Sequence, residues 1–168
     1  YKEFWLAVCA LRSHLENEGI KPGDRVAVYM RNCPEYLIAF YGIWSMGAVI
    51  LPINSNLHTK EVGWILENAG CAYVLCEESS ISEINFPGVT VFNPKWQQFD
   101  SNTHIPPVKR SSTDLAWLFY TSGTTGRPKG VMITHGMIKT MALSYFADVD
   151  QVHPSDTTLY AAPMSHGA

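Results

Sequence analysis

Short hydrophobic runs alternate with amphipathic stretches along the first half of the chain. Apolar residues recur at helical spacing between Phe4 and Leu15, and Gly19 supplies a stop signal. A second amphipathic stretch predicts a helix over about 60–69, capped by Thr59 and ended by Gly70. The apolar runs between such helices predict short strands over 25–30, 71–76 and 89–92. Helices alternating with apolar strands predict an α/β fold with an open, largely parallel sheet flanked by helices.

The segment YLIAFYGIWSMGAVILPI, residues 36–53, carries no charge and approaches the length of a membrane-spanning helix. Pro34 lies where helices tolerate proline, and Gly47 lies where helices end. We therefore predict a helix over about 34–46 and a buried strand over about 48–51, and no transmembrane segment.

The second half of the chain begins with a polar, proline-bearing stretch, residues 93–113, which predicts a surface loop or linker. The apolar run 114–120 predicts a buried strand that leads directly into a glycine-rich loop at 120–130. This loop should lie at the end of the sheet where ligands gather in open α/β folds. The later elements expected are a strand over 131–134, a helix over about 136–147 capped by Thr134, and a last strand over 157–162.

Composition and charge narrow the classes of function. The 168 residues are 46% hydrophobic and 16% charged, with a net charge of -3, which suits one domain with a real core and argues against a nucleic-acid partner. The chain starts at Tyr1 rather than Met, so we expect a piece of a longer polypeptide. Four cysteines form no CxxC pair and no histidines cluster near them, so reduced thiols in a cytoplasmic protein are favoured over zinc binding: Cys9, Cys33, Cys71 and Cys76.

The chemistry concentrates in residues 120–130, YTSGTTGRPKG. Glycines at 123, 126 and 130 let backbone N–H groups turn toward one concavity, which is how anion-binding nests form. The hydroxyl residues between them add donors, and Arg127 and Lys129 add positive charge. The loop therefore predicts a polyphosphate site.

The loop does not follow the Walker A pattern of common ATPases. That pattern would need glycine at position 128, which is Pro128, and Ser or Thr after Lys129, where Gly130 stands. A strand rather than a helix is expected next, so a helix dipole cannot be the main anion anchor. A plain flexible surface turn is disfavoured by the two cations and four hydroxyls in this short frame.

YTSGTTGRPKG resembles throughout the phosphate-loop signature of the adenylate-forming superfamily, which comprises acyl-CoA synthetases, luciferases and the adenylation domains of peptide synthetases. Residues 19–57 are similar to the early stretch of that family, with a Gly-Asp turn before a strand and a Gly-Ala pair before Pro-Ile-Asn. Residues 59–76 resemble its next helix and strand, and PMSHGA (163–168) resembles its following motif. The resemblance implies that residues 1–168 form one partial domain, a flavodoxin-like N-terminal subdomain of the adenylate-forming fold.

The resemblance also implies an activity. Such enzymes join a carboxylic acid to ATP, release pyrophosphate, and usually pass the acyl group to a thiol such as CoA. The leading hypothesis is a fragment of an AMP-forming acyl-CoA ligase, inactive by itself, that works with ATP, Mg²⁺, CoA and the remainder of its own polypeptide. The alternatives are a peptide-synthetase adenylation domain, a luciferase, and a non-catalytic phosphate-binding module.

Site residues carry over from the family motifs position by position. Lys129 and His166 would be the catalytic residues, with His166 orienting or gating near the α-phosphate, and Arg127 only supporting. Mg²⁺ would lie near Thr124 and Thr125. Seven residues would hold the β- and γ-phosphates, where charge builds as the bond breaks: Thr121, Ser122, Gly123, Thr124, Thr125, Gly126 and Lys129.

The remaining histidines and the aromatic residues lack such a context. We expect the many tryptophans and tyrosines to serve packing rather than an adenine stack. Five histidines are expected at the surface or at helix ends: His14, His58, His104, His135 and His153.

Overall fold

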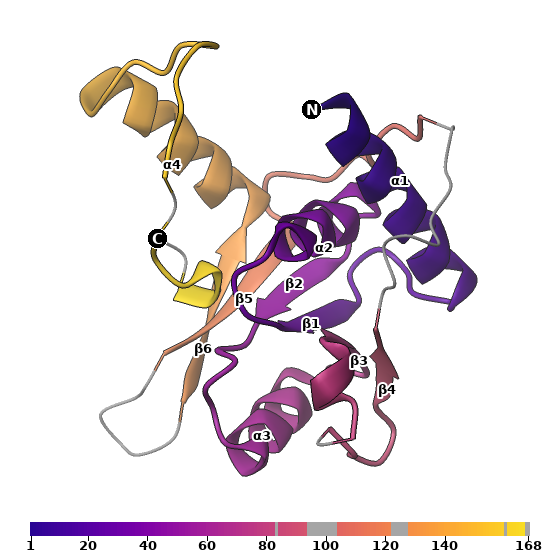
Figure 1. The fold of residues 1–168 in the computed structure, drawn as a ribbon. Coiled ribbons are helices and arrows are strands. Elements are labelled where there is room, and N and C mark those ends of the chain that lie inside the picture. The colour runs from indigo at the N-terminus through magenta and orange to yellow at the C-terminus, as the bar shows by residue number, and fades with distance from the viewer. Residues whose placement is uncertain (83, 94–103, 122–127, 160, 167–168) are drawn as a thin grey trace.

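The computed structural model of this protein describes residues 1–82, 84–93, 104–121, 128–159 and 161–166, and within these ranges six strands form a single sheet. Their order across the sheet is β4-β3-β1-β2-β5-β6 (Figure 1). The strands are β1 (Arg25–Tyr29), β2 (Val49–Pro52), β3 (Tyr73–Cys76), β4 (Thr90–Phe92), β5 (Leu115–Thr121) and β6 (Lys129–Thr134).

The prediction of a largely parallel sheet is confirmed. Strands β1 to β5 pair in parallel, and only the β5–β6 pair, among the strands described, is antiparallel. The first four strands follow the flavodoxin-like order, with β1 between β2 and β3. Strand β5 instead joins the outer side of β2, where Ile50 pairs with Trp117.

Helices cover both faces of this sheet. The chain moves from β1 to β2 in one direction and returns past β1 to reach β3. Because such crossovers are right-handed, the intervening helices α2 and α3 lie on opposite faces, and α1 packs beside α2 (Figure 1). The helices are α1 (Lys2–Asn17), α2 (Pro34–Ser45), α3 (Thr59–Ala69) and α4 (His135–Asp148), with short 3₁₀ turns η1 (Glu78–Ser80) and η3 (Met164–His166).

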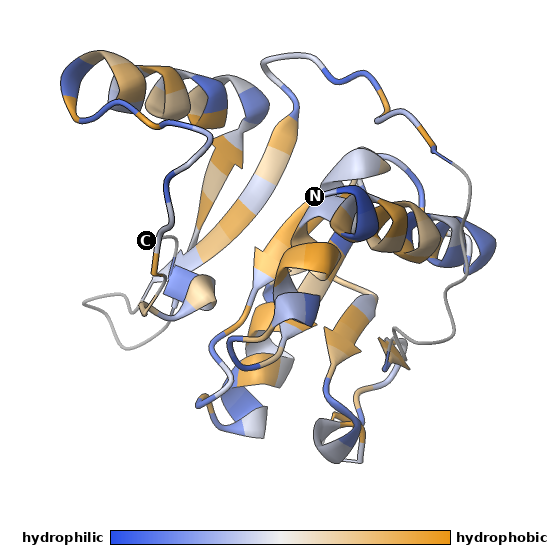
Figure 2. Cartoon of the chain, turned by 45° about the horizontal axis from the view of Figure 1, so that its top comes forward, coloured by the Kyte–Doolittle hydropathy of each residue, from blue (hydrophilic) through white to orange (hydrophobic). Residues whose placement is uncertain are grey.

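Two apolar layers result from the alternation of side chains along the strands. In β1, Val26 and Val28 point toward α1 and α2, whereas Ala27 and Tyr29 point toward α3. The central strands are accordingly mainly hydrophobic along their length (Figure 2). The first layer is tight because Gly42 of α2 meets α1: a side-chain carbon there would lie 2.6 Å from Cδ2 of Leu11.

The uncharged run at residues 36–53 divides into α2 and β2, as predicted, with Gly47 between them at φ +78°. Within the part of the chain that the structure describes, no helix is both long enough and apolar enough to cross a membrane.

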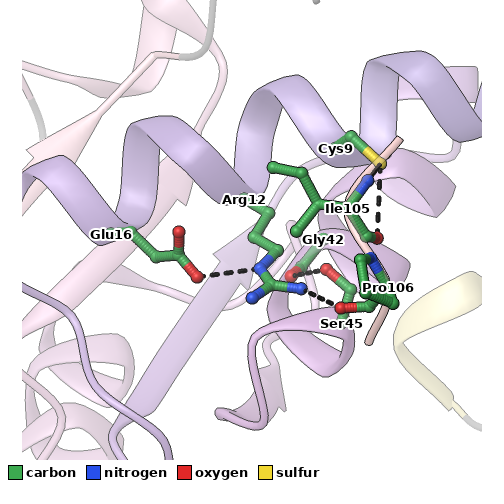
Figure 3. A network of polar contacts seen from close by, with 7 residues as sticks. All are labelled: Cys9, Arg12, Glu16, Gly42, Ser45, Ile105 and Pro106. Atoms are coloured by element: carbon green, nitrogen blue, oxygen red, sulfur yellow. Dashed lines mark hydrogen bonds and ion pairs between the residues drawn. The ribbon is translucent and has the colours of Figure 1, made fainter. Parts of the chain in front are cut away.

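Residues 104–113 contain no helix or strand and are held by hydrogen bonds to the first two helices. The Arg12 guanidinium donates through Nη1 to the Pro106 carbonyl at 2.6 Å (Figure 3). The Val108 N–H donates to the Ser45 carbonyl at the end of α2 at 2.8 Å. This segment therefore crosses the middle of α1 and the end of α2 before the chain enters β5.

The predicted cap of α3 is wrong by one residue. His58, not Thr59, caps this helix: its Nδ1 accepts the Lys60 N–H at 3.2 Å, and the Glu61 carboxylate accepts the His58 N–H at 3.2 Å. The two bonds form a capping box in which an imidazole nitrogen takes the usual place of a hydroxyl. The hydroxyl of Thr59 had suggested the more common cap.

The predicted last strand over 157–162 is also wrong. None of its described residues pairs with a strand, and Leu159 is 90% exposed. An apolar run becomes a strand only where a neighbouring strand offers its free edge. Here the Ala162 carbonyl instead accepts a hydrogen bond from the side chain of Asn32, at 2.8 Å.

Helix α4 and its predicted cap are confirmed, since the Thr134 hydroxyl accepts the Met137 N–H at 3.3 Å. This helix has no buried residue, and four of its apolar side chains are more than half exposed: Met137, Met141, Leu143 and Phe146. Helix α4 and β6 stand at one end of the sheet (Figure 1).

Candidate functional site

The parallel strands β1, β2 and β5 end at the same edge of the sheet, so the residues that follow them lie close together. A pocket of about 240 Å³ opens there, between the ends of β2 and β5. The residues that line it come from four separate parts of the sequence and include Asn54, Glu61, Thr121, Pro128 and His166.

The two ends of the predicted phosphate loop meet at this pocket. Thr121, the last residue of β5, pairs with Lys129, the first residue of β6, and both are exposed. The predicted position of the loop between two strands therefore holds, and β6 begins two residues earlier than expected. The antiparallel pairing of these two strands was not predicted. The other predicted loop residues lie outside the described ranges: Ser122, Gly123, Thr124, Thr125, Gly126 and Arg127.

The role predicted for Gly130 is wrong. This residue lies in β6, paired with Tyr120, and its φ is not positive, so it forms no part of a turn that gathers N–H groups. Glycine instead packs closely against a ring: a side-chain carbon at position 130 would lie 3.0 Å from Cζ of Tyr120 and 3.2 Å from its hydroxyl oxygen.

Tyr120 itself links the end of β5 to helix α3. Its hydroxyl donates to Oδ1 of Asn68 at 2.7 Å, and its ring meets the Trp64 ring edge-on, with centroids 6.2 Å apart. Burial raises the pKa of the Tyr120 phenol, and the nearby Cys71 adds to this effect. The phenol is thus a neutral, fixed wall of the pocket.

His166 reaches the same pocket from the C-terminal part of the chain. It ends the short turn η3, which contacts β2, and its Nε2 lies 3.2 Å from Nδ2 of Asn54. Asn32 holds the preceding backbone through the Met164 N–H and the Ala162 carbonyl, each at 2.8 Å. His166 was predicted from the sequence, whereas Asn32 and Asn54 were not, although each follows a buried strand that ends at this edge.

Comparison with known proteins agrees with this arrangement. The sequence profile of the family described as AMP-binding enzyme matches residues 1–168. The chain belongs to this family.

This AMP-binding enzyme chain aligns with only a part of each curated relative that it matches. It is 33% identical over 171 aligned residues to a crotonobetaine/carnitine–CoA ligase of Escherichia fergusonii, an alignment that covers 88% of this chain and 32% of that ligase. The chain thus spans about a third of the length of the curated relatives that it matches.

Two solved structures share the fold over nearly the whole chain. Apo MatB from Rhodopseudomonas palustris superimposes with a TM-score of 0.87 at 26% identity, covering 99% of this chain and 35% of MatB. The inhibitor-bound N-terminal domain of FACL13 from Mycobacterium tuberculosis gives 0.85 at 32% identity, covering 99% and 44%. The fold is therefore that of the N-terminal subdomain of adenylate-forming enzymes.

The described residues around the pocket offer few acidic ligands for a metal ion. No group of three or more His, Cys, Asp or Glu residues that could hold a metal ion occurs among the described residues. Glu61 is the acidic residue among the described pocket residues, and its carboxylate already accepts the His58 N–H. The two residues predicted near Mg²⁺, Thr124 and Thr125, lie outside the described ranges.

The other histidines lie away from the pocket, at helix ends or in loops, as expected. His58 caps α3, and His14 lies near the end of α1 with its ring edge-on to Phe92, at a centroid distance of 5.5 Å. His135 begins α4 and is half-buried. Burial lowers the pKa of His135, the positive charge of Arg110 adds to this effect, and Asp114 opposes it.

A cluster of aromatic residues packs helix α2 against strand β5. Phe40 lies edge-on to Trp44 and to Trp117, with centroids 4.6 and 5.3 Å apart. The Trp44 indole donates to the Ala116 carbonyl of β5 at 2.8 Å. This cluster fastens α2 to β5, and so positions the strand that leads into the loop.

Proposed function

We propose that this protein activates a carboxylic acid with ATP and then transfers the acyl group to CoA. The observation that carries the proposal is the pairing of Thr121 with Lys129, which brings both ends of the YTSGTTGRPKG loop to a pocket that His166 also lines. The named CoA-ligase activity of the similar Escherichia protein supports CoA as the acceptor.

In the first step, a carboxylate oxygen of the acid attacks the α-phosphorus of ATP. The bond from that phosphorus to the oxygen bridging the β-phosphate breaks, and pyrophosphate leaves with the bonding electrons. Negative charge grows on the β- and γ-phosphates, so donors already aimed at them lower the barrier. In the second step, the thiol of CoA loses its proton to solvent and its sulfur attacks the acyl carbonyl carbon. The bond from that carbon to the phosphate oxygen breaks, and AMP leaves with the bonding electrons.

The chain's own residues serve the leaving group in this proposal. The Lys129 ammonium supplies positive charge, and the Thr121 hydroxyl supplies a donor at the opposite end of the loop. Ser122, Gly123, Thr124, Thr125 and Gly126 complete the set that holds the β- and γ-phosphates. His166 contributes an imidazole nitrogen near the α-phosphate, where it orients the reacting groups.

Mg²⁺ bound with ATP would neutralise part of the phosphate charge, with the hydroxyls of Thr124 and Thr125 as its nearest protein contacts. The four thiols of the chain are free, which supports a reducing compartment such as the cytoplasm. Because residues 1–168 correspond to about a third of the similar ligases, we expect no turnover from these residues alone.

The experiment is exchange of labelled pyrophosphate into ATP, run with and without a panel of carboxylic acids, on the polypeptide that carries this chain. We expect exchange only with an acid present, and a loss of roughly a hundredfold in Lys129→Ala. Lys139→Ala, which removes an exposed lysine of α4, is the matched control. ATP hydrolysis that needs no acid and is lost in Lys129→Ala would instead indicate a nucleoside triphosphatase.

The acceptor is tested separately by adding either CoA or a carrier protein with a phosphopantetheine thiol. Release of AMP that depends on CoA is the expected result. Transfer to the carrier alone would identify a peptide-synthetase adenylation domain, and absence of both exchange and transfer would indicate a non-catalytic phosphate-binding module.

A further inference from the structure

Two asparagines stand side by side at the edge of the sheet where the candidate site lies. Asn32 follows β1 by three residues and Asn54 follows β2 by two, and these parallel strands are in register, with Val28 opposite Pro52. Their side chains therefore emerge at the same level and face the segment that carries His166.

Asn32 binds the backbone on both sides of Pro163. Its Oδ1 accepts the Met164 N–H and its Nδ2 donates to the Ala162 carbonyl, each at 2.8 Å. The amide thereby uses its acceptor and one donor at two points that are 130 residues or more away in sequence. Met164 packs against the α1–α2 side of the core, so this contact fixes the path of the chain into η3.

The Asn54 side chain contacts the imidazole ring directly, and a second hydrogen bond sets the orientation of its amide. Oδ1 of Asn54 accepts the Asn56 N–H at 2.9 Å, which leaves Nδ2 facing Nε2 of His166 at 3.2 Å. A reversed amide would set its NH₂ group against the Asn56 N–H, with two donors and no acceptor. The His166 Nε2 must therefore accept, and in a neutral imidazole the proton is then on Nδ1.

The loop that carries Asn54 is itself fixed by the core. The hydroxyl of Tyr29, a residue only 6% exposed, lies 3.2 Å from the carbonyl oxygens of both Ser55 and Leu57. The Leu57 N–H donates to the Asn54 carbonyl at 3.0 Å. The side-chain amide of Asn54 is thus presented from a rigid turn.

We propose that Asn32 and Asn54 are positioning residues for His166, Asn32 by fixing the backbone and Asn54 by selecting the Nδ1–H tautomer. Nδ1–H is then the hydrogen-bond donor that the ring offers to an oxygen of a ligand in the pocket. Its part in turnover, and only that part, rests on the proposed function.

The tautomer is measured by long-range proton–nitrogen correlation in protein labelled with ¹⁵N-histidine, at a pH where the ring is neutral. A His166→Gln variant assigns the signals of His166. The wild type should show a protonated Nδ1 and an unprotonated Nε2. A proton on Nε2 in the wild type would overturn the proposal.

The decisive variant is Asn54→Asp, which keeps the size of the side chain and the acceptor for the Asn56 N–H. Its second oxygen can only accept, so the His166 proton should move to Nε2. An unchanged tautomer would contradict the assignment. The control is Asn56→Ala, because this exposed residue contributes only its backbone N–H to the hydrogen bond with Asn54. In this variant the His166 proton should stay on Nδ1.

For Asn32, the readout is hydrogen exchange of the Met164 amide. Asn32→Ala should accelerate it by roughly fivefold, the loss of one neutral hydrogen bond. Both asparagine contacts lie at the surface, so the melting temperature should hardly change. Unchanged exchange in a folded Asn32→Ala protein would remove Asn32 from the proposal.

In pyrophosphate exchange, Asn54→Asp should lower kcat by roughly fivefold to tenfold while the KM for ATP stays nearly constant. A larger change in KM than in kcat would contradict a role in orienting His166. If the wild type shows no exchange at all, the proposed function fails, whereas the tautomer measurements still decide the positioning of His166.

Discussion

Cζ of Tyr120 lies 3.0 Å from the position that a side-chain carbon of residue 130 would take, across the β5–β6 pair at the entrance to the phosphate loop. Gly130→Ala should destabilise the protein by about 1 kcal/mol, because the Tyr120 ring would have to shift against its contacts with Asn68 and Trp64. Urea unfolding measures this loss. In a Tyr120→Ala background the same substitution should cost much less, and an equal cost in both backgrounds would contradict the packing explanation.

Arg12 is the buried cation that ties α1 to residues 104–113, with 8% exposure, a bond of 2.6 Å to the Pro106 carbonyl and a contact of 2.8 Å to Glu16 (Figure 3). Arg12→Ala should cost about 2–3 kcal/mol in unfolding free energy, since it removes a charge-assisted bond. Glu16→Ala should cost less than about 1 kcal/mol, because the Glu16 side chain is 43% exposed. Equal costs in urea unfolding would show that the ion pair dominates.

The four thiols differ in accessibility. Cys33 is half-buried, whereas Cys9, Cys71 and Cys76 are buried. Burial raises the pKa of Cys71 and of Cys76 to about 11, and it raises that of Cys33 as well. In the native protein a disulfide reagent should modify only Cys33, and more slowly than a free thiol; all four should react after unfolding. Two fast-reacting native thiols, or unchanged labelling of Cys33→Ser, would contradict this.

His135 gives the stability a dependence on pH. Burial and the charge of Arg110 lower its pKa in the folded protein below the ordinary value of 6.5. Between the two pKa values the unfolded chain binds more protons, so the free energy of unfolding should fall as the pH drops through 6.5. Urea unfolding across this range should give a shallower slope for His135→Gln, and parallel slopes would contradict the assignment.

Local patterns predict most of the elements. Pro34 and Gly47 mark the ends of α2 because both act through their own backbone geometry. The sequence could not reveal that the apolar run 157–162 forms no strand among its described residues, because strand formation depends on a partner strand as well as on the run itself. The position of β5 beside β2 likewise depends on contacts between distant residues.

For the candidate site, the prediction of a loop between two strands is confirmed, and Thr121 and Lys129 pair where those strands meet the loop. The role of Gly130 was predicted wrongly because a glycine packed closely against a ring looks the same in sequence as one in a turn. The contacts of Asn32 and Asn54 to the His166 segment span more than 100 residues, and only the folded edge of the sheet brings them together.

We propose above all that the segment connecting β5 and β6 binds the pyrophosphate part of ATP. This binding is tested most directly by titrating pyrophosphate into ¹⁵N-labelled protein. The amide signals of Thr121, Lys129 and Gly130 should shift and saturate together. Lys129→Gln should weaken binding by roughly tenfold or more, the loss of one charge-assisted hydrogen bond, while Lys139→Gln should leave it unchanged. No shift at these three residues, or equal affinity in Lys129→Gln, would contradict a phosphate site between β5 and β6.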